Sequence, residues 1–365
     1  MIGTTPHAGT TPRPGTSHAG TSHAGTTHAA AVCDAGPALP PATRVVTGLT
    51  ASGRLHLGNY LGAIQPLLRL AADPGTHALV LVADVHALTV EHDPAQLRAR
   101  TRELAATLLA CGLDGDATLF VQSAVPAHIE LGHLLESAVT YGELTRMIQF
   151  KVKGDGQESV RAALLTYPAL MAADILLHQA DAVPVGQDQR QHLELTRTIA
   201  QRFNARYGEV FTVPDGIVPQ TAARIRDLRN PTAKMGKSTA GPGTVYLTDT
   251  PVRLAAAVRS AVTDLDPELS YDPGLRPGVA NLAEILGALT DRTPQAALIG
   301  LHGSGALKAA VTQSLVETLR SVRERYTELT DDPAALDAVL AAGARAAAEH
   351  AAPTLTAARR ALGLS

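Results

Sequence analysis

Residues 45–64 read VVTGLTASGRLHLGNYLGAI, and this stretch decides the fold. The β-branched run at 45–47 favours a buried strand, and Gly48 and Gly53 are typical of a loop. From Leu57 onward the spacing of apolar residues changes to that of an amphipathic helix. The sequence therefore predicts a strand, a loop and a helix N-terminus in direct succession.

The predicted helix N-terminus has the properties of a polyphosphate site. Unpaired backbone N–H groups and the positive end of a helix dipole attract anions, and glycine lets a ligand approach the backbone. Neither GxGxxG nor GxxxxGK[ST] is present, and the polar residues at the turn are instead His56 and Asn59, with Gly58 between them. Taken alone, these residues would also suit an ordinary strand-to-helix turn with a satisfied histidine.

A second motif lies far downstream, where residues 234–238 read KMGKS. Of the 31 basic residues in the chain, 26 are arginines and the other five are Lys151, Lys153, Lys234, Lys237 and Lys308. Lysine is a compact ammonium on a flexible stem, whereas arginine presents a rigid planar fork. Two of five lysines in one short loop therefore indicate a site that requires mobile positive charge.

The segments that follow 45–64 alternate between strand and helix patterns. Residues 77–90 read as a buried strand leading to a polar turn, 97–112 as an amphipathic helix and 117–123 as the next strand. This alternation predicts an α/β fold with a parallel, doubly wound, Rossmann-like sheet and right-handed crossovers. Ligands of such sheets lie beyond the carboxyl ends of the strands, which places His56, Asn59, Asp84 and His86 around one crevice.

After residue 227 the strand signals fade. Stretches rich in Ala, Leu, Glu and Arg predict helices at 251–263, 280–290, 305–327 and 334–362, with breaks at Pro and Gly. We therefore expect a catalytic domain at 44–226 and a helical region at 227–365, whose last helix could pack back on the sheet.

Residues 167–189 contain a carboxylate in apolar surroundings. Met171 and Asp174 lie three positions apart (i, i+3) on the helix expected after Pro168, so they share a face. A buried carboxylate is costly unless it has a partner. Asp174 is therefore expected either to bind a ligand donor or to serve as an N-capping or ion-paired acid.

The bulk composition is that of a soluble globular protein with about two domains. Hydrophobic residues make up 45% and charged residues 18% of the 365 residues, and no run reaches the length of a membrane helix. Neither a signal peptide nor a basic excess is present, since the net charge is −3, so we expect a cytoplasmic protein with no membrane and no DNA partner. The two cysteines, Cys33 and Cys111, exclude a disulfide framework and make a cysteine-based zinc site an unfavourable interpretation.

Residues 1–43 differ from the rest of the chain. They consist mostly of Thr, Ser, Gly, Ala, Pro and His with a loose HAGT repeat, and such a composition cannot bury a core. We expect a disordered tail. Metal binding by its histidines is the alternative, at His7, His18, His23 and His28.

The H-x-G-N motif at 56–59 and the K-M-x-K-S motif at 234–238 together resemble the two ATP-binding signatures of class I aminoacyl-tRNA synthetases. Residues 167–204, YPALMAADILLHQADAVPVGQDQRQHLELTRTIAQRFN, resemble the bacterial tryptophanyl-tRNA synthetases rather than other members. The resemblance runs from Arg44 to the C-terminus. It implies an ATP-dependent tryptophan–tRNA ligase that uses Mg²⁺, forms a homodimer, and contacts the anticodon of tRNA(Trp) through its helical region.

The resemblance also implies residue roles. Catalysis is assigned to His56, Asn59, Lys234 and Lys237. ATP contacts are implied at Thr50, Ser52, Gly58, Asn59, Gly186, Asp188, Gln189, Lys234, Met235, Lys237 and Ser238. Tryptophan contacts are implied at Val46, His86, Tyr167, Met171, Asp174, Val183, Val185 and Gln189. No residue is expected to bind a metal ion directly.

Several positions depart from the family pattern. The family commonly has Gln-Pro at Thr50-Ala51, Ser at Gly236, Asp at Thr239 and Glu at Gln187. The changes at Gly236 and Thr239 leave a synthetase-like regulator without turnover as an alternative. A tyrosyl enzyme of the same class is the other alternative, and Met171 argues against it because a phenol pocket is expected to carry more polar groups. The chain also contains no tryptophan. Chance can produce this, but it also suggests an auxiliary enzyme that tolerates a tryptophan-mimicking antibiotic.

Overall fold

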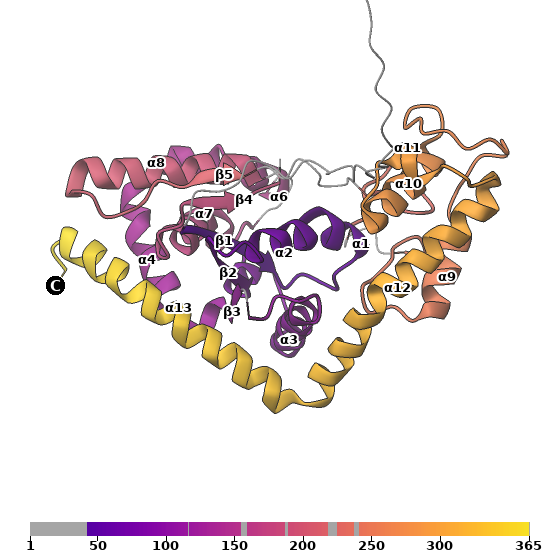
Figure 1. The fold of residues 1–365 in the computed structure, drawn as a ribbon. Coiled ribbons are helices and arrows are strands. Elements are labelled where there is room, and N and C mark those ends of the chain that lie inside the picture. The colour runs from indigo at the N-terminus through magenta and orange to yellow at the C-terminus, as the bar shows by residue number, and fades with distance from the viewer. Residues whose placement is uncertain are drawn as a thin grey trace, which may run out of the picture. The chain divides into compact units, whose positions relative to one another are not determined.

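A five-stranded parallel sheet organises the protein, as the sequence predicts (Figure 1). The strands are β1 (Thr43–Thr50), β2 (Thr76–Ala83), β3 (Ala117–Val121), β4 (Ala182–Pro184) and β5 (Asp215–Ile217). Their order is β3-β2-β1-β4-β5, and every neighbouring pair is parallel. The chain builds outward from β1 to β3 and then returns to the other side of β1, so the sheet has its switch point between β1 and β4. In doubly wound sheets ligands bind at this point.

This computed structural model describes residues 42–115, 117–154, 159–186, 189–217, 225–236 and 241–364, without the side chains of residues 153 and 154. The predicted tail therefore lies outside the described residues, apart from Ala42 and Thr43. Thr43 is buried and begins β1, so this strand starts one residue before residue 44, where the sequence predicts that the catalytic domain begins.

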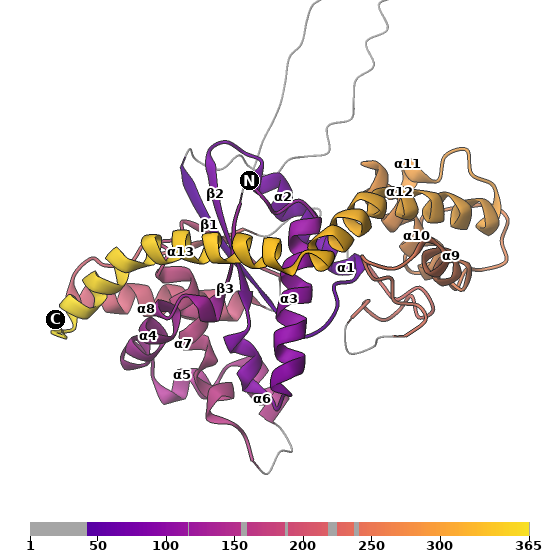
Figure 2. The ribbon, with the colours of Figure 1, turned by 90° about the horizontal axis from the view of Figure 1, so that it is seen from below.

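The helices lie on both faces and beyond one end of the sheet (Figures 1 and 2). They are α1 (Leu57–Asn59), α2 (Gln65–Ala71), α3 (Pro94–Ala110), α4 (Ala127–Leu135), α5 (Tyr141–Thr145), α6 (Ile148–Gly154), α7 (Ala162–Leu176), α8 (Arg190–Tyr207), α9 (Pro251–Arg259), α10 (Pro277–Thr290), α11 (Pro294–Ala297), α12 (Gly303–Asp331) and α13 (Pro333–Ala361). A π-helical segment at Tyr60–Ile64 joins α1 to α2 without a break. Short 3₁₀ turns occur at Val85–Thr89, Gln122–Ala124 and Glu136–Ala138.

Alternate side chains of β2 enter two hydrophobic cores. Val80 and Val82 belong to the core that contains α3 and the C-terminal helices α9, α10 and α12. Leu79 and Leu81 belong to the core that contains α4, α7, α8 and part of α13. Because side chains alternate across a strand, this pattern requires that both faces of the sheet are covered.

Gly48 lies inside β1, whereas the sequence predicted a loop there. A Cβ at this position would come within 3.2 Å of Cγ of Leu81 on the neighbouring strand, so the absence of a side chain allows close packing. The strand thereby extends to Thr50 and carries the chain directly to the switch point.

Pro168 also differs from the prediction, because α7 begins before it, at Ala162. Proline removes the hydrogen bond to the carbonyl four residues earlier, but the helix continues through this position and Pro168 is buried. Met171 and Asp174 therefore lie in the second half of one 15-residue helix.

The last two helices turn back toward the sheet. Asp332 caps the N-terminus of α13, and Pro333 occupies its first turn, which separates α13 from α12. In Figure 2, α13 crosses the region of β3. A Cβ on Gly343 of α13 would overlap the carbonyl oxygen of Leu119 in β3, so the helix lies directly against this edge strand. None of the helices in the described ranges is both long enough and apolar enough to cross a membrane.

Candidate active site

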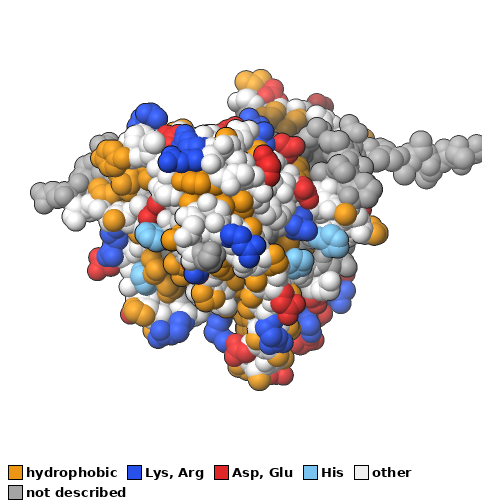
Figure 3. Space-filling view, turned by 90° about the vertical axis from the view of Figure 1, so that its left-hand side faces the viewer, with side chains coloured by type: hydrophobic (Ala, Val, Ile, Leu, Met, Phe, Trp, Pro, Cys, Tyr) orange, Lys and Arg blue, Asp and Glu red, His pale blue; other side chains and the backbone are white. Residues whose placement is uncertain are grey.

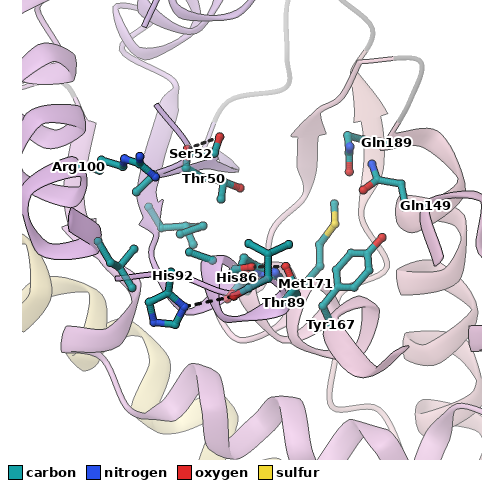
Figure 4. A pocket seen from close by; sticks show the side chains of 18 of the residues that line it. Thr50, Ser52, His86, Thr89, His92, Arg100, Gln149, Tyr167, Met171 and Gln189 are labelled. Carbon is teal, nitrogen blue, oxygen red and sulfur yellow. Dashed lines mark hydrogen bonds and ion pairs between the residues drawn. The ribbon is translucent and has the colours of Figure 1, made fainter. Parts of the chain in front are cut away.

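A cavity of about 1090 Å³ opens at the carboxyl ends of β1, β2 and β4 (Figure 4). Thr50 ends β1, Ala83 ends β2, and Pro184 ends β4, and all three line the cavity. Typical small-molecule pockets occupy roughly 300–1,000 Å³. The cavity at the switch point is therefore large enough for more than one small ligand.

All eight residues predicted to contact the amino acid line this one cavity. Four are apolar and four are polar, namely Val46, Met171, Val183 and Val185, and His86, Tyr167, Asp174 and Gln189. In Figure 4, Met171 and Tyr167 extend from α7 into the cavity, His86 lies at its floor, and Gln189 lies across from Thr50 and Ser52. The structure thus combines an apolar wall with a few convergent polar groups, which is typical of a selective pocket.

Asp174 is held by three side chains of the protein. Its Oδ2 lies 2.8 Å from Nε2 of His86, and its Oδ1 accepts hydrogen bonds from Nε2 of Gln122 at 2.7 Å and from Nδ1 of His128 at 2.7 Å. The residue is only 5% exposed. The fold itself therefore supplies donors that offset the cost of burying this carboxylate.

These donors decide the charge of the carboxyl group. Burial by itself raises the pKa of Asp174, but hydrogen bonds from His128 and His86 lower it by more, so the pKa lies well below its usual range. Asp174 therefore stays a carboxylate and only accepts hydrogen bonds.

Tyr167 contributes a neutral hydroxyl to the cavity. Its hydroxyl is hydrogen-bonded to Nε2 of His192, and burial raises the pKa of Tyr167 to about 12. A protonated phenol oxygen also has lone pairs with which it can accept a hydrogen bond. This arrangement suits an oxygen that faces an ammonium group.

The residues predicted to contact ATP are less concentrated. Thr50, Ser52 and Gln189 line the cavity. Gly58, Asn59, Gly186, Lys234 and Met235 do not line it, and neither do His56 and Asp84. Asp188, Lys237 and Ser238 lie outside the described residues.

His56 and Asn59 form the N-terminus of the first helix by binding each other. Nδ1 of His56 accepts from the backbone N–H of Asn59 at 3.3 Å, and Oδ1 of Asn59 accepts from the backbone N–H of His56 at 3.1 Å. This reciprocal pair is a capping box. A Cβ on Gly58 would come within 3.1 Å of Nδ1 of His56, so glycine at this position leaves room for the imidazole ring.

The helix start is also joined to the segment that follows the lysine motif. The backbone N–H of Leu57 donates to the carbonyl of Val245 at 2.8 Å, and that of Leu247 donates to the carbonyl of Leu55 at 3.1 Å. Met235 is fully buried in the core that contains Leu57 and Val245. Its side chain therefore anchors the motif, while its neighbour Lys234 is exposed.

Sequence reasoning missed part of the cavity. The segment from Ala87 to Arg100 follows His86 and supplies a second side of the lining, including His92 and Arg100 (Figure 4). This segment follows directly after β2, as His86 does, and that position is the sequence signal that could have identified it as part of the cavity lining. The partners of Asp174, in contrast, lie 46 to 88 residues away in sequence, and no local pattern marks them.

The described residues offer no cluster of three or more His, Cys, Asp or Glu side chains suited to a metal ion.

Comparisons with known proteins agree with this geometry. The family model for tRNA synthetases of class I (W and Y) matches residues 40–319. The tryptophan–tRNA ligase 1 of Streptomyces coelicolor is 50% identical over 330 residues, which cover 88% of this chain and 97% of that protein.

Two solved structures are similar as well. The tryptophanyl-tRNA synthetase of Mycoplasma pneumoniae has a TM-score of 0.79 and 36% identity, and covers 88% of this chain and 98% of its own. The tryptophanyl-tRNA synthetase of Campylobacter jejuni, complexed with ADP and tryptophan, has a TM-score of 0.76 and 32% identity. The match covers 88% of this chain and 100% of that protein. This chain belongs to the tRNA synthetases of class I (W and Y), and the relatives it matches here are bacterial tryptophan–tRNA ligases.

Proposed function

We propose that this protein is an ATP-dependent tryptophan–tRNA ligase. The observation that carries the proposal is the cavity in which all eight residues assigned to tryptophan come together around an ionised, buried Asp174. An apolar wall suits the indole ring, and a carboxylate suits its N–H. The names of the similar proteins support the same substrate.

The reaction has two steps. In the first, a carboxylate oxygen of tryptophan attacks the α-phosphorus of ATP, the bond between the α-phosphorus and the bridging oxygen breaks, and pyrophosphate leaves. In the second, a ribose hydroxyl at the tRNA 3′ end attacks the carbonyl carbon of the adenylate. The bond to AMP then breaks, and the hydroxyl proton is lost to solvent. Neither step requires a protein nucleophile, so the protein acts by orientation and by stabilising charge.

Each part of the cavity has a place in this scheme. Tyr167 and Gln189 would receive the substrate ammonium, and Thr50 and Ser52 lie where the nucleotide would enter. His56 and Asn59 would act from the helix N-terminus, and Lys234 and Lys237 would bring mobile positive charge to the pyrophosphate. Mg²⁺ bound to the phosphates would offset part of their negative charge. Gly58, Gly186, Asp188, Met235 and Ser238 complete the proposed ATP contacts.

The test is ATP–pyrophosphate exchange measured with each of the twenty amino acids. We expect exchange that depends on tryptophan and that is lost when Lys234 and Lys237 are both replaced by alanine. Exchange stimulated by tyrosine instead would assign the protein to the tyrosyl enzymes. No exchange with any amino acid would favour the regulator without turnover and would overturn the proposal.

We also propose that the enzyme is a homodimer. Four large apolar side chains on α4, α5 and α6 are exposed, namely Ile129 at 50%, Tyr141 at 74%, Ile148 at 61% and Val152 at 72%. The side of the molecule where α4, α8 and the end of α13 lie shows hydrophobic side chains between charged ones (Figure 3). Exposed apolar surface of this kind is typical of a contact with another protein.

The region after residue 227 is proposed to meet the anticodon of tRNA(Trp). Its described part contains the helices α9 to α13, and α12 packs on α3 of the catalytic part, which would connect the two functions mechanically. A cytoplasmic location follows from the proposed tRNA substrate.

An auxiliary, inhibitor-tolerant role is a second proposal. It is supported by the absence of tryptophan from the chain and by Thr50, which lines the cavity where the family commonly has glutamine. A contact can stabilise a bound inhibitor more than it stabilises bound tryptophan. Losing such a contact gives roughly tenfold tolerance for each ~1.4 kcal/mol of this difference in binding free energy. Inhibition by an indole-based analogue should therefore be weaker for the native protein than for Thr50→Gln. Native sensitivity equal to that of an ordinary bacterial enzyme would refute this role.

A further inference from the structure

Three buried side chains support Asp174 from behind the cavity. Gln122, His128 and His178 are 0%, 0% and 1% exposed, and none of them lines the cavity. They come from the turn after β3, from α4 and from the turn after α7. They can therefore affect a ligand only indirectly, through the residues that they contact, and Asp174 is one of these.

The hydrogen bonds define the orientation of the carboxylate. Oδ1 receives the N–H groups of both Gln122 and His128, whereas Oδ2 receives only His86. The amide of Gln122 is oriented in turn, because its Oε1 accepts the backbone N–H of Val85 at 3.2 Å. A carboxylate oxygen accepts about two hydrogen bonds. Oδ2 thus keeps capacity for one more donor, on a residue that lines the cavity.

The protons of the two buried histidines can be placed by the same reasoning. Since Asp174 only accepts, Nδ1 of His128 must carry a proton. Nε2 of His178 lies 3.2 Å from Nε2 of His128, so exactly one of these nitrogens donates. Burial is the main cause that lowers the pKa of His178 to about 3, which keeps this ring neutral. The arrangement without a buried imidazolium has Nε2–H of His178 donating to Nε2 of His128.

The position of both rings is well determined by packing. Phe120 contacts both imidazoles, with ring centroids 5.7 Å from His128 and 5.6 Å from His178. Nδ1 of His178 is buried without a hydrogen-bond partner among the described residues. Two imidazoles packed against a phenylalanine, one of them with a buried nitrogen that has no hydrogen-bond partner, are costly for stability. This cost indicates a role beyond filling space.

We propose that His128 is a positioning residue for the selection of tryptophan. By donating from Nδ1 to Oδ1 it holds the Asp174 carboxylate so that Oδ2 accepts the indole N–H, and His178 holds His128 in the tautomer that this requires. This inference rests on the proposed function. It adds to the pocket two residues that no substrate atom would touch.

The test compares tryptophan with the isosteric analogue in which sulfur replaces the indole N–H. Pyrophosphate exchange is measured for the native protein, His128→Leu and His128→Asn. The side-chain amide of asparagine places an N–H close to where Nδ1 of histidine lies, whereas leucine offers none. In His128→Leu we expect kcat/KM for tryptophan to fall about 100-fold through KM, with the analogue and the KM for ATP changed by less than about threefold. His128→Asn should retain most of the preference for tryptophan.

Several outcomes would overturn the proposal. Parallel losses with both amino acids in His128→Leu would mean that His128 only supports the core, and no loss would mean that it is dispensable. A variant with asparagine that behaves like the one with leucine would exclude the donor role. A native protein without tryptophan-dependent exchange would instead refute the proposed function, so the two failures are distinguishable.

A spectroscopic measurement on the native protein avoids dependence on folded variants. In ¹⁵N-histidine spectra, the signals of His128 and His178 are assigned by their loss in His128→Asn and His178→Gln. We expect a proton on Nδ1 of His128 and one on Nε2 of His178. His128 protonated only on Nε2 could not donate to Asp174, and the proposal would then be wrong.

Discussion

The buried imidazole of His178 makes the stability of the protein depend on pH. Its pKa is about 3 in the folded protein, against about 6.5 for a free histidine, and the groups that face it are His128 from α4, Asp174 from α7, His350 from α13 and Arg44 from β1. Between these two pH values the unfolded chain binds the additional proton, so stability falls as pH falls. The slope approaches roughly 1.4 kcal/mol per pH unit, or about 2 kcal/mol between pH 6.5 and pH 5.

Melting temperatures measured from pH 7 to pH 5 test this expectation. His178→Gln removes the titrating ring but keeps an N–H that can reach His128, so its melting temperature should vary less with pH. The exposed His77 on β2 provides the control, because its side chain is in solvent in both states. His77→Gln should have the same pH dependence as the native protein, and an equal effect of both substitutions would contradict the assignment to His178.

At the residue scale, sequence reasoning succeeded where neighbours in sequence are neighbours in space. Met171 and Asp174 share one helix, and Val183 and Val185 belong to one strand and its continuation, so their common pocket could be predicted. His128 and Gln122 reach Asp174 only because three elements pack together, and such contacts leave no periodic pattern. The capping box of His56 and Asn59 was likewise not predicted, because the H-x-G-N motif was interpreted as an ATP-binding signature and not as a helix cap.

At the element scale, β1, β2, β3, α3 and the helices after residue 250 could be predicted because these segments have a clear periodicity, whereas the three-residue strand β5 was not predicted. The errors occur where one residue acts against its usual preference. Gly48 continues a strand because Leu81 occupies the space beside it, and Pro168 lies within a helix that tertiary packing keeps intact. Both depend on partners distant in sequence.

The contact between α13 and β3 gives a prediction at this scale. Alanine normally favours a helix over glycine by about 1 kcal/mol. At Gly343, however, a Cβ would overlap the carbonyl oxygen of Leu119, and neither backbone can move freely. We expect Gly343→Ala to lower the free energy of unfolding by about 1–3 kcal/mol and to lower the melting temperature by several degrees.

Gly305 of α12 is the matched control. A Cβ there would meet no atom within 4 Å, so Gly305→Ala should leave the melting temperature unchanged or slightly higher. A loss of stability in Gly305→Ala that equals the loss in Gly343→Ala would show that the close approach of α13 to β3 is not the cause.

For the whole molecule, the proposed dimer can be tested at its apolar surface. Tyr141→Asp combined with Ile148→Asp places two charges on exposed positions of α5 and α6, where desolvation of a carboxylate would oppose association. We expect light scattering at micromolar concentration to give a dimer for the native protein and a monomer for the double variant.

Leu265 serves as the control for this experiment, since it is fully exposed in the loop between α9 and α10. Leu265→Asp should remain dimeric. A native protein that is monomeric under the same conditions would refute the dimer, and a dimeric double variant would place the interface elsewhere.

The apolar wall formed by Val46, Met171, Val183 and Val185 has an optical consequence. An indole that leaves water for such surroundings emits at shorter wavelength, and a chain without tryptophan contributes no indole emission of its own. Excitation at the red edge of the aromatic absorption band therefore selects the substrate over the seven tyrosines of the protein. The protein itself contributes no indole fluorescence, so bound tryptophan is the indole fluorophore of the complex. Occupancy of the cavity can therefore be followed directly, without labels and before any chemistry takes place.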